Sequence, residues 1–326
     1  MKVLAGDIGG THARLAIVEL GDRARILAER TAPSQEVRSV AELVESFLAG
    51  QPERPSRACF GIAGPVVNGM VSGTNLPWTL DARELARSLR IPALRLINDF
   101  EAAAHAVSRL EQKDLLTLQQ GERDPRGAIA LIGAGTGLGE GFLVRAGSGF
   151  SVQASEGGHA SFAPEDARGW ELFQYLAARH GHVSWERVLS GPGLVAVFEF
   201  LAAGREWSGE QALRAELARE DKGAVISRHA LAQSDPVAVA ALDLFVDAYG
   251  AQAGNLALTV LATGGVYLAG GIARQIAPKL GDGSFMNAFL RKGRMAGLLA
   301  RMPVQVILNP DVGLLGAAAA AALADS

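Results

Sequence analysis

"LAGDIGGTHARLAI" (residues 4–17) places one acid, two adjacent glycines and a threonine between two apolar runs. Turns rich in glycine often hold phosphate, because consecutive backbone N–H groups can point together at an anion. The stretch nevertheless fits neither G-x-x-x-x-G-K-[ST] nor G-x-G-x-x-G. Residues 13–20 alternate with period two, so the turn is predicted to lie between two strands and not before a helix.

A second stretch repeats this layout. "GAIALIGAGTGLGEGFLV" (residues 127–144) also reads as strand, glycine-rich turn and strand, and Leu138 breaks the G-x-G-x-x-G spacing. The repetition predicts two similar halves that face each other.

Strand and helix patterns alternate along the remaining chain, which predicts an α/β fold. A length of 326 residues favours about two domains, and a boundary near residue 110 is the best estimate. Strands are expected at 2–8, 57–66, 93–99, 264–269 and the start of 302–324, and helices at 39–49, 81–90, 100–110, 167–181, 191–202, 236–262, after Gly270-Gly271 and at the end of 302–324.

Composition excludes several classes of protein. The net charge of −3 argues against a nucleic-acid-binding face, and the single cysteine, Cys59, rules out an intramolecular disulfide or a four-cysteine zinc site. Cys59 is expected to be a buried apolar residue. We find neither a signal peptide nor an apolar run long enough to span a bilayer, and expect a soluble protein of the reducing cytoplasm.

The two glycine-rich turns carry the first candidate site residues. Gly9 and Gly10 permit positive φ, and Thr11 offers a hydroxyl. Asp7 would repel a phosphate in the same turn unless a cation lay between them, and we expect this cation to be Mg²⁺ held through water. An ordinary hairpin turn is the alternative for each stretch. Gly270-Gly271 would suit close packing of adenine, although a tight strand–helix turn explains it equally well.

A polar pair ends the apolar strand at 93–99. Asn98 and Asp99 lie where open α/β sheets bind ligands, beyond the carboxyl ends of strands. Asp99 could be the general base for a hydroxyl nucleophile, and an ordinary pKa near ~3.9 would keep it ionised at pH 7. The alternative is that Asp99 caps the helix that follows.

Further polar residues stand around glycines in "EGGHASF" (156–162) and "WERVLSGPG" (185–193). Glu156, His159 and Glu186 could ligate a metal, but they lack an H-E-x-x-H pattern. Carboxylates that each accept from two vicinal hydroxyls suit a polyol. His159 could instead cap its own turn.

Together these motifs resemble the bacterial glucokinase family of the actin-like ATPase superfamily, not the repressor–ORF–kinase (ROK) type, which normally carries a cysteine-rich zinc motif. The resemblance runs in order along nearly the whole chain, through "GDIGGTHARLA", "GIAGPV", "TNLPW", "LINDFEAAAHAV", "IGAGTGLG", "EGGHASFAP", "ERVLSGPGL", "LAGGIA" and "NPDVGLLGAA".

This resemblance implies a two-lobed, ribonuclease H-like α/β fold with a central cleft, and an ATP:glucose 6-phosphotransferase that acts with Mg²⁺ as a homodimer. The lobes would be residues 1–110 with 310–326, and residues 111–309. ATP would contact Gly6, Asp7, Ile8, Gly9, Gly10, Thr11, Gly135, Thr136, Gly137, Gly270 and Gly271. Glucose would contact Asn98, Asp99, Glu156, His159 and Glu186, with Asp99 as the catalytic base.

The sequence departs from the family pattern at two positions. His12 stands where asparagine is usual and receives no role, and Glu140 either weakens nucleotide binding or points outward. Two other functions stay open. One is a kinase for mannose, fructose or an amino sugar, and the other is a non-catalytic sugar sensor, which would need a DNA-binding element that we do not find.

Overall fold

The computed structural model describes residues 1–326 except 22, 73–77, 148, 204–210 and 324–326. Its internal contacts divide the chain into two compact units, Met1–Asp114 with Asn309–Ser326, and Leu115–Leu308. Residues 74–77 of the "TNLPW" motif lie outside the described residues.

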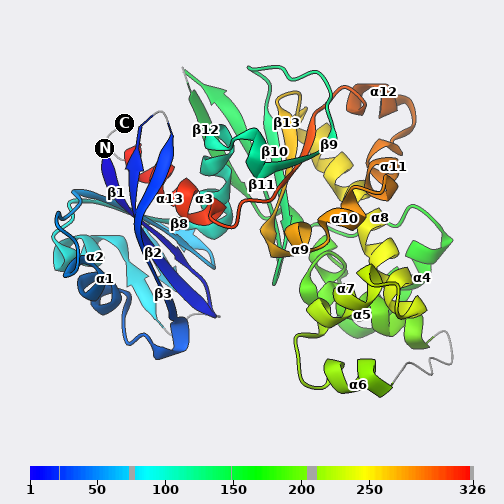
Figure 1. Cartoon of the computed structure of the whole chain (residues 1–326). Coiled ribbons are helices and arrows are strands. Elements are labelled where there is room, and N and C mark those ends of the chain that lie inside the picture. The colour runs from blue at the N-terminus through cyan, green and yellow to red at the C-terminus, as the bar shows by residue number, and fades with distance from the viewer. Residues whose placement is uncertain (22, 73–77, 148, 204–210, 324–326) are drawn as a thin grey trace. The chain divides into compact units, whose positions relative to one another are not determined.

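The first unit is built on a mixed sheet with the strand order β3-β2-β1-β4-β8 (Figure 1). The predicted hairpin is confirmed, because β1 pairs antiparallel with β2 and Ile8 lies opposite Ala13. Strands β1, β4 and β8 run parallel, which brings their carboxyl ends to one edge. The strands are β1 (Lys2–Ile8), β2 (His12–Leu20), β3 (Ala24–Pro33), β4 (Arg57–Ile62) and β8 (Ala93–Asn98).

Apolar residues alternate between the two faces of this sheet, so each face has its own core. Leu4 and Ile8 pack with α1 (Val40–Leu48) and α2 (Ala82–Leu89). Val3 and Ala5 pack with α3 (Asp99–Ala106) and α13 (Val312–Ala322), as does Cys59, which is buried as expected. A small antiparallel sheet, β5-β6-β7, lies between β4 and α2 in the sequence; its strands are β5 (Val66–Val67), β6 (Met70–Ser72) and β7 (Thr79–Asp81).

Helix starts in this unit follow the sequence signals. Ser39 caps α1 by accepting a hydrogen bond from the Glu42 N–H, and Asp81 caps α2, both as predicted. The strand expected at 57–66 already ends at Ile62, and the helix expected from residue 100 begins one residue earlier, at Asp99.

The second unit repeats the arrangement of the first. Its sheet has the order β12-β11-β10-β13-β14-β9, in which β10, β11 and β12 are antiparallel and β10, β13 and β14 are parallel. The predicted similarity of the two halves is confirmed at the level of topology. The strands are β9 (Leu115–Gln119), β10 (Ile129–Ala134), β11 (Leu138–Ala146), β12 (Gly149–Ser155), β13 (Gly265–Ala269) and β14 (Val304–Ile307).

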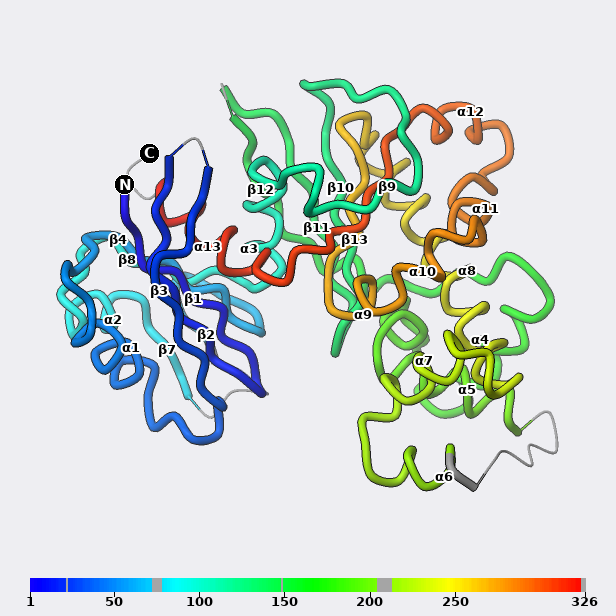
Figure 2. Tube along the Cα trace, viewed as in Figure 1, coloured from blue at the N-terminus to red at the C-terminus, as the bar shows by residue number. Residues whose placement is uncertain are grey.

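Helices dominate the rest of this unit, and the tube in Figure 2 follows their order along the chain. The long α8 contributes Phe245 and Tyr249 to a core shared with β10 and α11. The helices are α4 (Ala167–His180), α5 (Gly191–Ala203), α6 (Gln211–Leu217), α7 (Lys222–Leu231), α8 (Pro236–Val260), α9 (Gly270–Gln275), α10 (Ala277–Leu280), α11 (Ser284–Leu290) and α12 (Ala296–Leu299). Within the described residues, no helix combines the length and apolar character needed to cross a lipid bilayer.

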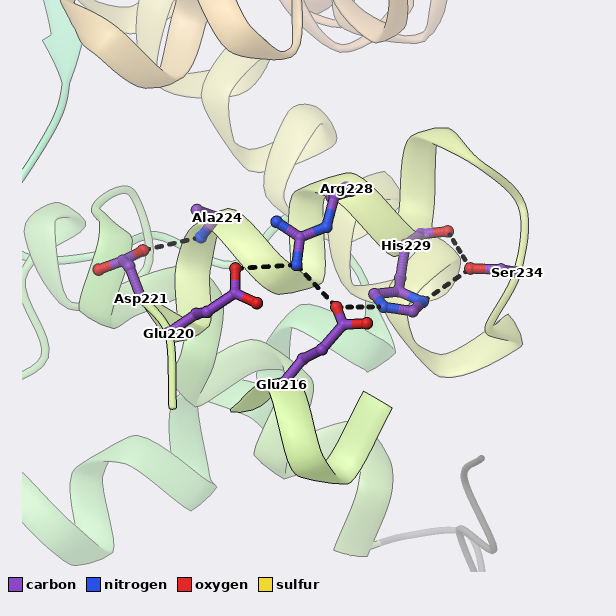
Figure 3. A network of polar contacts seen from close by, with 7 residues as sticks. All are labelled: Glu216, Glu220, Asp221, Ala224, Arg228, His229 and Ser234. Carbon is purple, nitrogen blue, oxygen red and sulfur yellow. Dashed lines mark hydrogen bonds and ion pairs between the residues drawn. The ribbon is translucent and has the colours of Figure 1, made fainter. Parts of the chain in front are cut away.

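A polar network joins α6 to α7 (Figure 3). The Glu216 carboxylate accepts a hydrogen bond from Arg228 at 2.7 Å and lies 3.0 Å from the Nε2 atom of His229, whose Nδ1 atom is 2.8 Å from the Ser234 hydroxyl. These contacts lower the pKa of Glu216, because Arg228 and His229 both stabilise its charged form. The network holds α6 against α7, and α6 is so short that its helical structure would be only marginally stable on its own.

Helix α13 packs closely on α3 at Gly316. A Cβ atom placed at this glycine would overlap the main-chain carbonyl group of Ala102, so the two helix backbones are nearly in contact. Because a main-chain carbonyl cannot turn aside as a side chain can, any larger residue would push the helices apart.

We therefore predict that Gly316→Ala lowers the free energy of unfolding by about 1–3 kcal/mol through overpacking. Urea denaturation measures this change. Gly297→Ala in α12 is the matched control, because a Cβ there meets no atom within 4 Å. Equal stability of the two variants would contradict the close packing of α13 on α3.

Candidate functional site

The first glycine-rich turn, residues 9–11, is held from behind by Ser34. Ser34 is buried, and its hydroxyl donates a hydrogen bond to the Gly9 carbonyl at 2.6 Å. The backbone N–H of Ser34 donates to the Thr11 carbonyl at 2.9 Å. The Gly9 N–H closes the turn on the His12 carbonyl at 2.9 Å. Neither Gly9 nor Gly10 has positive φ, so the turn does not use the conformational freedom that these glycines permit. Sequence reasoning also missed Ser34, which lies too far along the chain to be linked to the turn.

Gly6 is required by packing inside the sheet. A Cβ atom at this position would lie 2.6 Å from the ring of Phe60 on the neighbouring strand β4. Ile8, the last residue of β1, is fully buried. These two residues therefore support the turn from the core.

Asp7 lies at the end of β1, opposite Arg14 on β2. Burial raises the pKa of its carboxyl group, and the positive charge of Arg14 partly offsets this. The Arg14 guanidinium hydrogen-bonds Glu29 at 2.7 Å and Asp311 at 2.6 Å. A Cβ at Gly313 would lie 2.8 Å from the Asp7 Oδ2 atom, so α13 approaches this carboxylate closely.

Asn98 ends β8 and Asp99 begins α3, at the same sheet edge as Asp7. Asn98, and not Asp99, caps α3: its Oδ1 atom accepts from the Phe100 N–H at 2.8 Å, while its Nδ2 atom donates to the Gly64 carbonyl at 3.0 Å. The amide of Asn98 thus binds backbone on both sides.

The Asp99 carboxyl group has an altered pKa. Although the residue is exposed, the protein around the carboxyl removes water and raises its pKa to about 6, and the negative charge of Asp7 adds to the rise. The ordinary value assumed from the sequence is therefore wrong. The Asp99 carboxyl also accepts from the Phe100 N–H at 2.8 Å, which favours the charged form and limits the shift.

In the second unit, residues 135–137 form a closed turn between β10 and β11. The Gly135 N–H donates to the Gly137 carbonyl at 2.8 Å, and Thr136 is exposed. Gly270, at the start of α9, has φ +91° and approaches the Ala134 carbonyl too closely for a Cβ. The structure thus brings the glycine pair Gly270-Gly271 beside the base of this turn, and the tight strand–helix turn accounts for Gly270.

Glu156, His159 and Glu186 come together in the same unit. The His159 Nε2 atom is 3.9 Å from the Glu156 carboxylate, and its Nδ1 atom is 3.8 Å from the Glu186 carboxylate. His159 and Glu186 stand on short helical turns, η4 (Gly157–His159) and η5 (Trp185–Arg187), and Glu156 immediately precedes η4. An imidazole between two carboxylates forms a polar surface of the kind that binds vicinal hydroxyl groups. The described residues hold no cluster of three or more His, Cys, Asp or Glu side chains arranged for a metal ion.

Glu140 does not point outward, which corrects one of the two expectations for it. Only 4% of the residue is exposed, and its Oε1 atom accepts a hydrogen bond from Gln252 of α8 at 2.7 Å. Burial raises the pKa of Glu140. Its other oxygen lies against Gly157, where it leaves no space for a Cβ. Glu140 thus supports the η4 turn from below, whereas His12 is exposed at the start of β2.

Known proteins are similar to this chain over nearly its whole length. The family profile of glucokinases matches residues 4–324. A glucokinase of Nostoc sp. is 46% identical, with 98% of each chain covered. Among solved structures, a glucokinase from an Antarctic psychrotroph has a TM-score of 0.87 at 33% identity, with 99% of each chain covered.

A more distant structure shares the fold. The ROK family glucokinase from Streptomyces griseus, solved in complex with glucose and AMPPNP, has a TM-score of 0.67 at 22% identity, with 99% of this chain and 100% of that chain covered. The family profile and the full-length relatives, together with the α/β architecture, define an enzyme of the sugar kinase class.

Within that class the chain belongs to the glucokinase family. The predicted membership and the predicted two-domain fold are both confirmed.

Asn98 offers a direct test of the local geometry. We predict that Asn98→Ala lowers the free energy of unfolding by about 1–2 kcal/mol, because α3 loses its cap. Urea denaturation gives the value. Glu101→Ala, in the first turn of the same helix, serves as the control, because Glu101 contributes only its backbone N–H to the cap and not its side chain. An unchanged stability of Asn98→Ala would show that this side chain does not cap α3.

Proposed function

We propose that this chain transfers the γ-phosphoryl group of ATP to the primary hydroxyl of glucose. One observation carries the proposal: the polar cluster of Glu156, His159 and Glu186 lies directly beside the glycine turn at residues 135–137, to which Glu186 is hydrogen-bonded. A polyol-binding surface is thus adjacent to a turn suited to phosphate, as transfer between the two ligands requires.

The proposed sugar ligands are Asn98 and Asp99 of the first unit and Glu156, His159 and Glu186 of the second. Carboxylates accept from hydroxyl groups, and a site built in this way rejects sugars that leave its polar groups unpaired. The proposed nucleotide ligands are Gly6, Asp7, Ile8, Gly9, Gly10, Thr11, Gly135, Thr136, Gly137, Gly270 and Gly271. The glucose and AMPPNP bound by the Streptomyces griseus protein support this pairing of ligands.

Asp99 is the proposed catalytic base. Phosphoryl transfer passes through a loose transition state, so positioning and charge stabilisation matter more than early proton removal. The sugar oxygen attacks the γ-phosphorus in line, ADP leaves, and Asp99 takes the hydroxyl proton late. A pKa of about 6 leaves the carboxylate mostly ionised at pH 7 and makes it a stronger base than an ordinary aspartate.

The residues around Asp7 fit a magnesium ion. The Asp7 carboxylate is partly buried, and Arg14 gives its hydrogen bonds to Glu29 and Asp311. Mg²⁺ typically uses one or two carboxylates together with water and substrate phosphates. Asp7 would hold the ion through water, and the bound ion would neutralise charge on the phosphates.

Three further features belong to the proposal. The lobes of the enzyme would be residues 1–110 with 310–326 and residues 111–309, and sugar binding would bring about closure that excludes water. The enzyme would act as a homodimer. We also propose that the protein is located in the reducing cytoplasm, because its single cysteine, Cys59, is a buried free thiol.

The experiment that tests the proposal measures ADP release from MgATP with glucose, mannose, fructose, N-acetylglucosamine or no sugar. We expect strong release with glucose and little without sugar. Release that is faster with another hexose would assign that sugar instead. Release without sugar would contradict closure and indicate an ATPase.

In the same assay, we predict that Asp99→Asn lowers turnover by about 10²–10⁴-fold, since no base then accepts the proton. Glucose binding, measured by calorimetry, should persist because the amide oxygen can still accept a hydrogen bond from the sugar hydroxyl. Glu101→Gln, on the same helix turn, is the control and should keep its turnover. Near-normal turnover of Asp99→Asn would exclude Asp99 as the base.

The raised pKa of Asp99 also predicts the pH dependence. Because the base must be deprotonated, kcat/KM for glucose should fall as the pH is lowered through about 6, the value for the free enzyme. A profile of kcat/KM for glucose between pH 5 and 8 at saturating MgATP checks this. A profile that stays flat down to pH 5 would contradict the raised pKa.

A further inference from the structure

Glu186 makes two kinds of contact with its one carboxylate. The Oε2 atom accepts a hydrogen bond from the backbone N–H of Leu138 at 2.9 Å, at the end of the glycine turn. The Oε1 atom lies 3.8 Å from the His159 Nδ1 atom, on the side of the polar cluster. The same side chain therefore touches the turn proposed for nucleotide and the cluster proposed for sugar.

The main chain beneath this carboxylate is held firmly. Trp185 is 3% exposed and packs edge-to-face on Phe162, with ring centroids 4.9 Å apart. The Trp185 N–H donates to the Ala160 carbonyl at 3.0 Å, and the Ser190 hydroxyl donates to the Glu186 carbonyl at 2.8 Å. The position of the carboxylate is thus fixed from within the fold, and it can in turn fix the turn it contacts.

The same segment contacts the other end of the turn. The Gly191 N–H, at the start of α5, donates to the Gly135 carbonyl at 2.8 Å. A Cβ at Gly137 would lie 2.5 Å from the Glu186 Oε2 atom, so the carboxylate also packs against the middle of the turn. Residues 186–191 therefore hold the turn from Gly135 to Leu138.

We propose that Glu186 couples the two sites: its bond to the Leu138 amide sets the shape of the nucleotide turn, and a sugar hydroxyl on the same carboxylate strengthens that effect. This inference rests on the proposed function. A sugar that donates to Oε1 restricts rotation of the carboxylate and keeps Oε2 on the amide. Because such coupling is reciprocal, nucleotide on the turn favours sugar to the same extent.

Charge and hydrogen bonding act in opposite directions here. The negative charge of Glu186 repels phosphate, whereas its hydrogen bond orders the turn that receives phosphate. A glutamine keeps an acceptor for the Leu138 amide and removes the charge, and an alanine removes both. Comparing Glu186→Gln with Glu186→Ala therefore separates the two effects.

The test measures the Kd of MgADP by calorimetry without any sugar. We expect Glu186→Ala to weaken MgADP about fivefold or more and Glu186→Gln to bind at least as tightly as the wild type. Glu156→Ala is the matched control, because Glu156 borders the same cluster through His159. It should lose glucose phosphorylation and yet keep the wild-type Kd for sugar-free MgADP.

Hydrogen exchange at the Leu138 amide gives a readout that needs no ligand. Faster exchange in Glu186→Ala but not in Glu156→Ala supports the proposal, whereas an unchanged Kd for MgADP, or tighter binding by Glu186→Ala, overturns it. Failure of the proposed function is seen separately, as a wild type that binds MgADP but shows no sugar-dependent ADP release. A wild type that binds no MgADP overturns both.

Discussion

The parallel alignment of β1, β4 and β8 is the constraint on which the first unit depends. It brings the ends of β1 and β8, and hence Asp7 and Asp99, to one edge of the sheet. Burial and the negative charge of Asp7 both raise the pKa of Asp99. The two carboxyl groups at this edge therefore favour a bound cation, and Asp99 binds a proton more readily than an ordinary aspartate does. A basic carboxylate and a place for a cation are thus two results of one strand order.

The second unit meets a different demand with the same topology. Its turn at residues 135–137 contains no acidic residue, and the carboxylate of Glu186 contacts it from η5. Glu140 supports η4 from the core through Gln252, and Trp185 anchors η5 against Phe162. The polar surface therefore rests on buried contacts, which fix side chains that are themselves partly exposed.

Much of this arrangement could be predicted from local sequence. Period-two alternation identified the first hairpin, and the repeated layout of strand, glycine-rich turn and strand identified the second. Ser39 and Asp81 identified helix starts, because each of these signals acts within a few residues. The capping of α3 by Asn98, the inward position of Glu140 and the bond between Glu186 and Leu138 were not predicted. The cap by Asn98 is a local contact. The position of Glu140 and the bond of Glu186 depend on how distant segments pack, and so does the raised pKa of Asp99.

The place of α13 affects the order in which the chain folds. This helix comes from residues 312–322, yet it covers the face of the first sheet that carries Val3 and Ala5 of β1. It also approaches Asp7 through Gly313. During synthesis, Leu115–Leu308 emerges as one continuous unit, whereas the first unit must keep an apolar face uncovered until its last helix arrives. The strands of the first unit therefore complete their core only after residues 312–322 have been made.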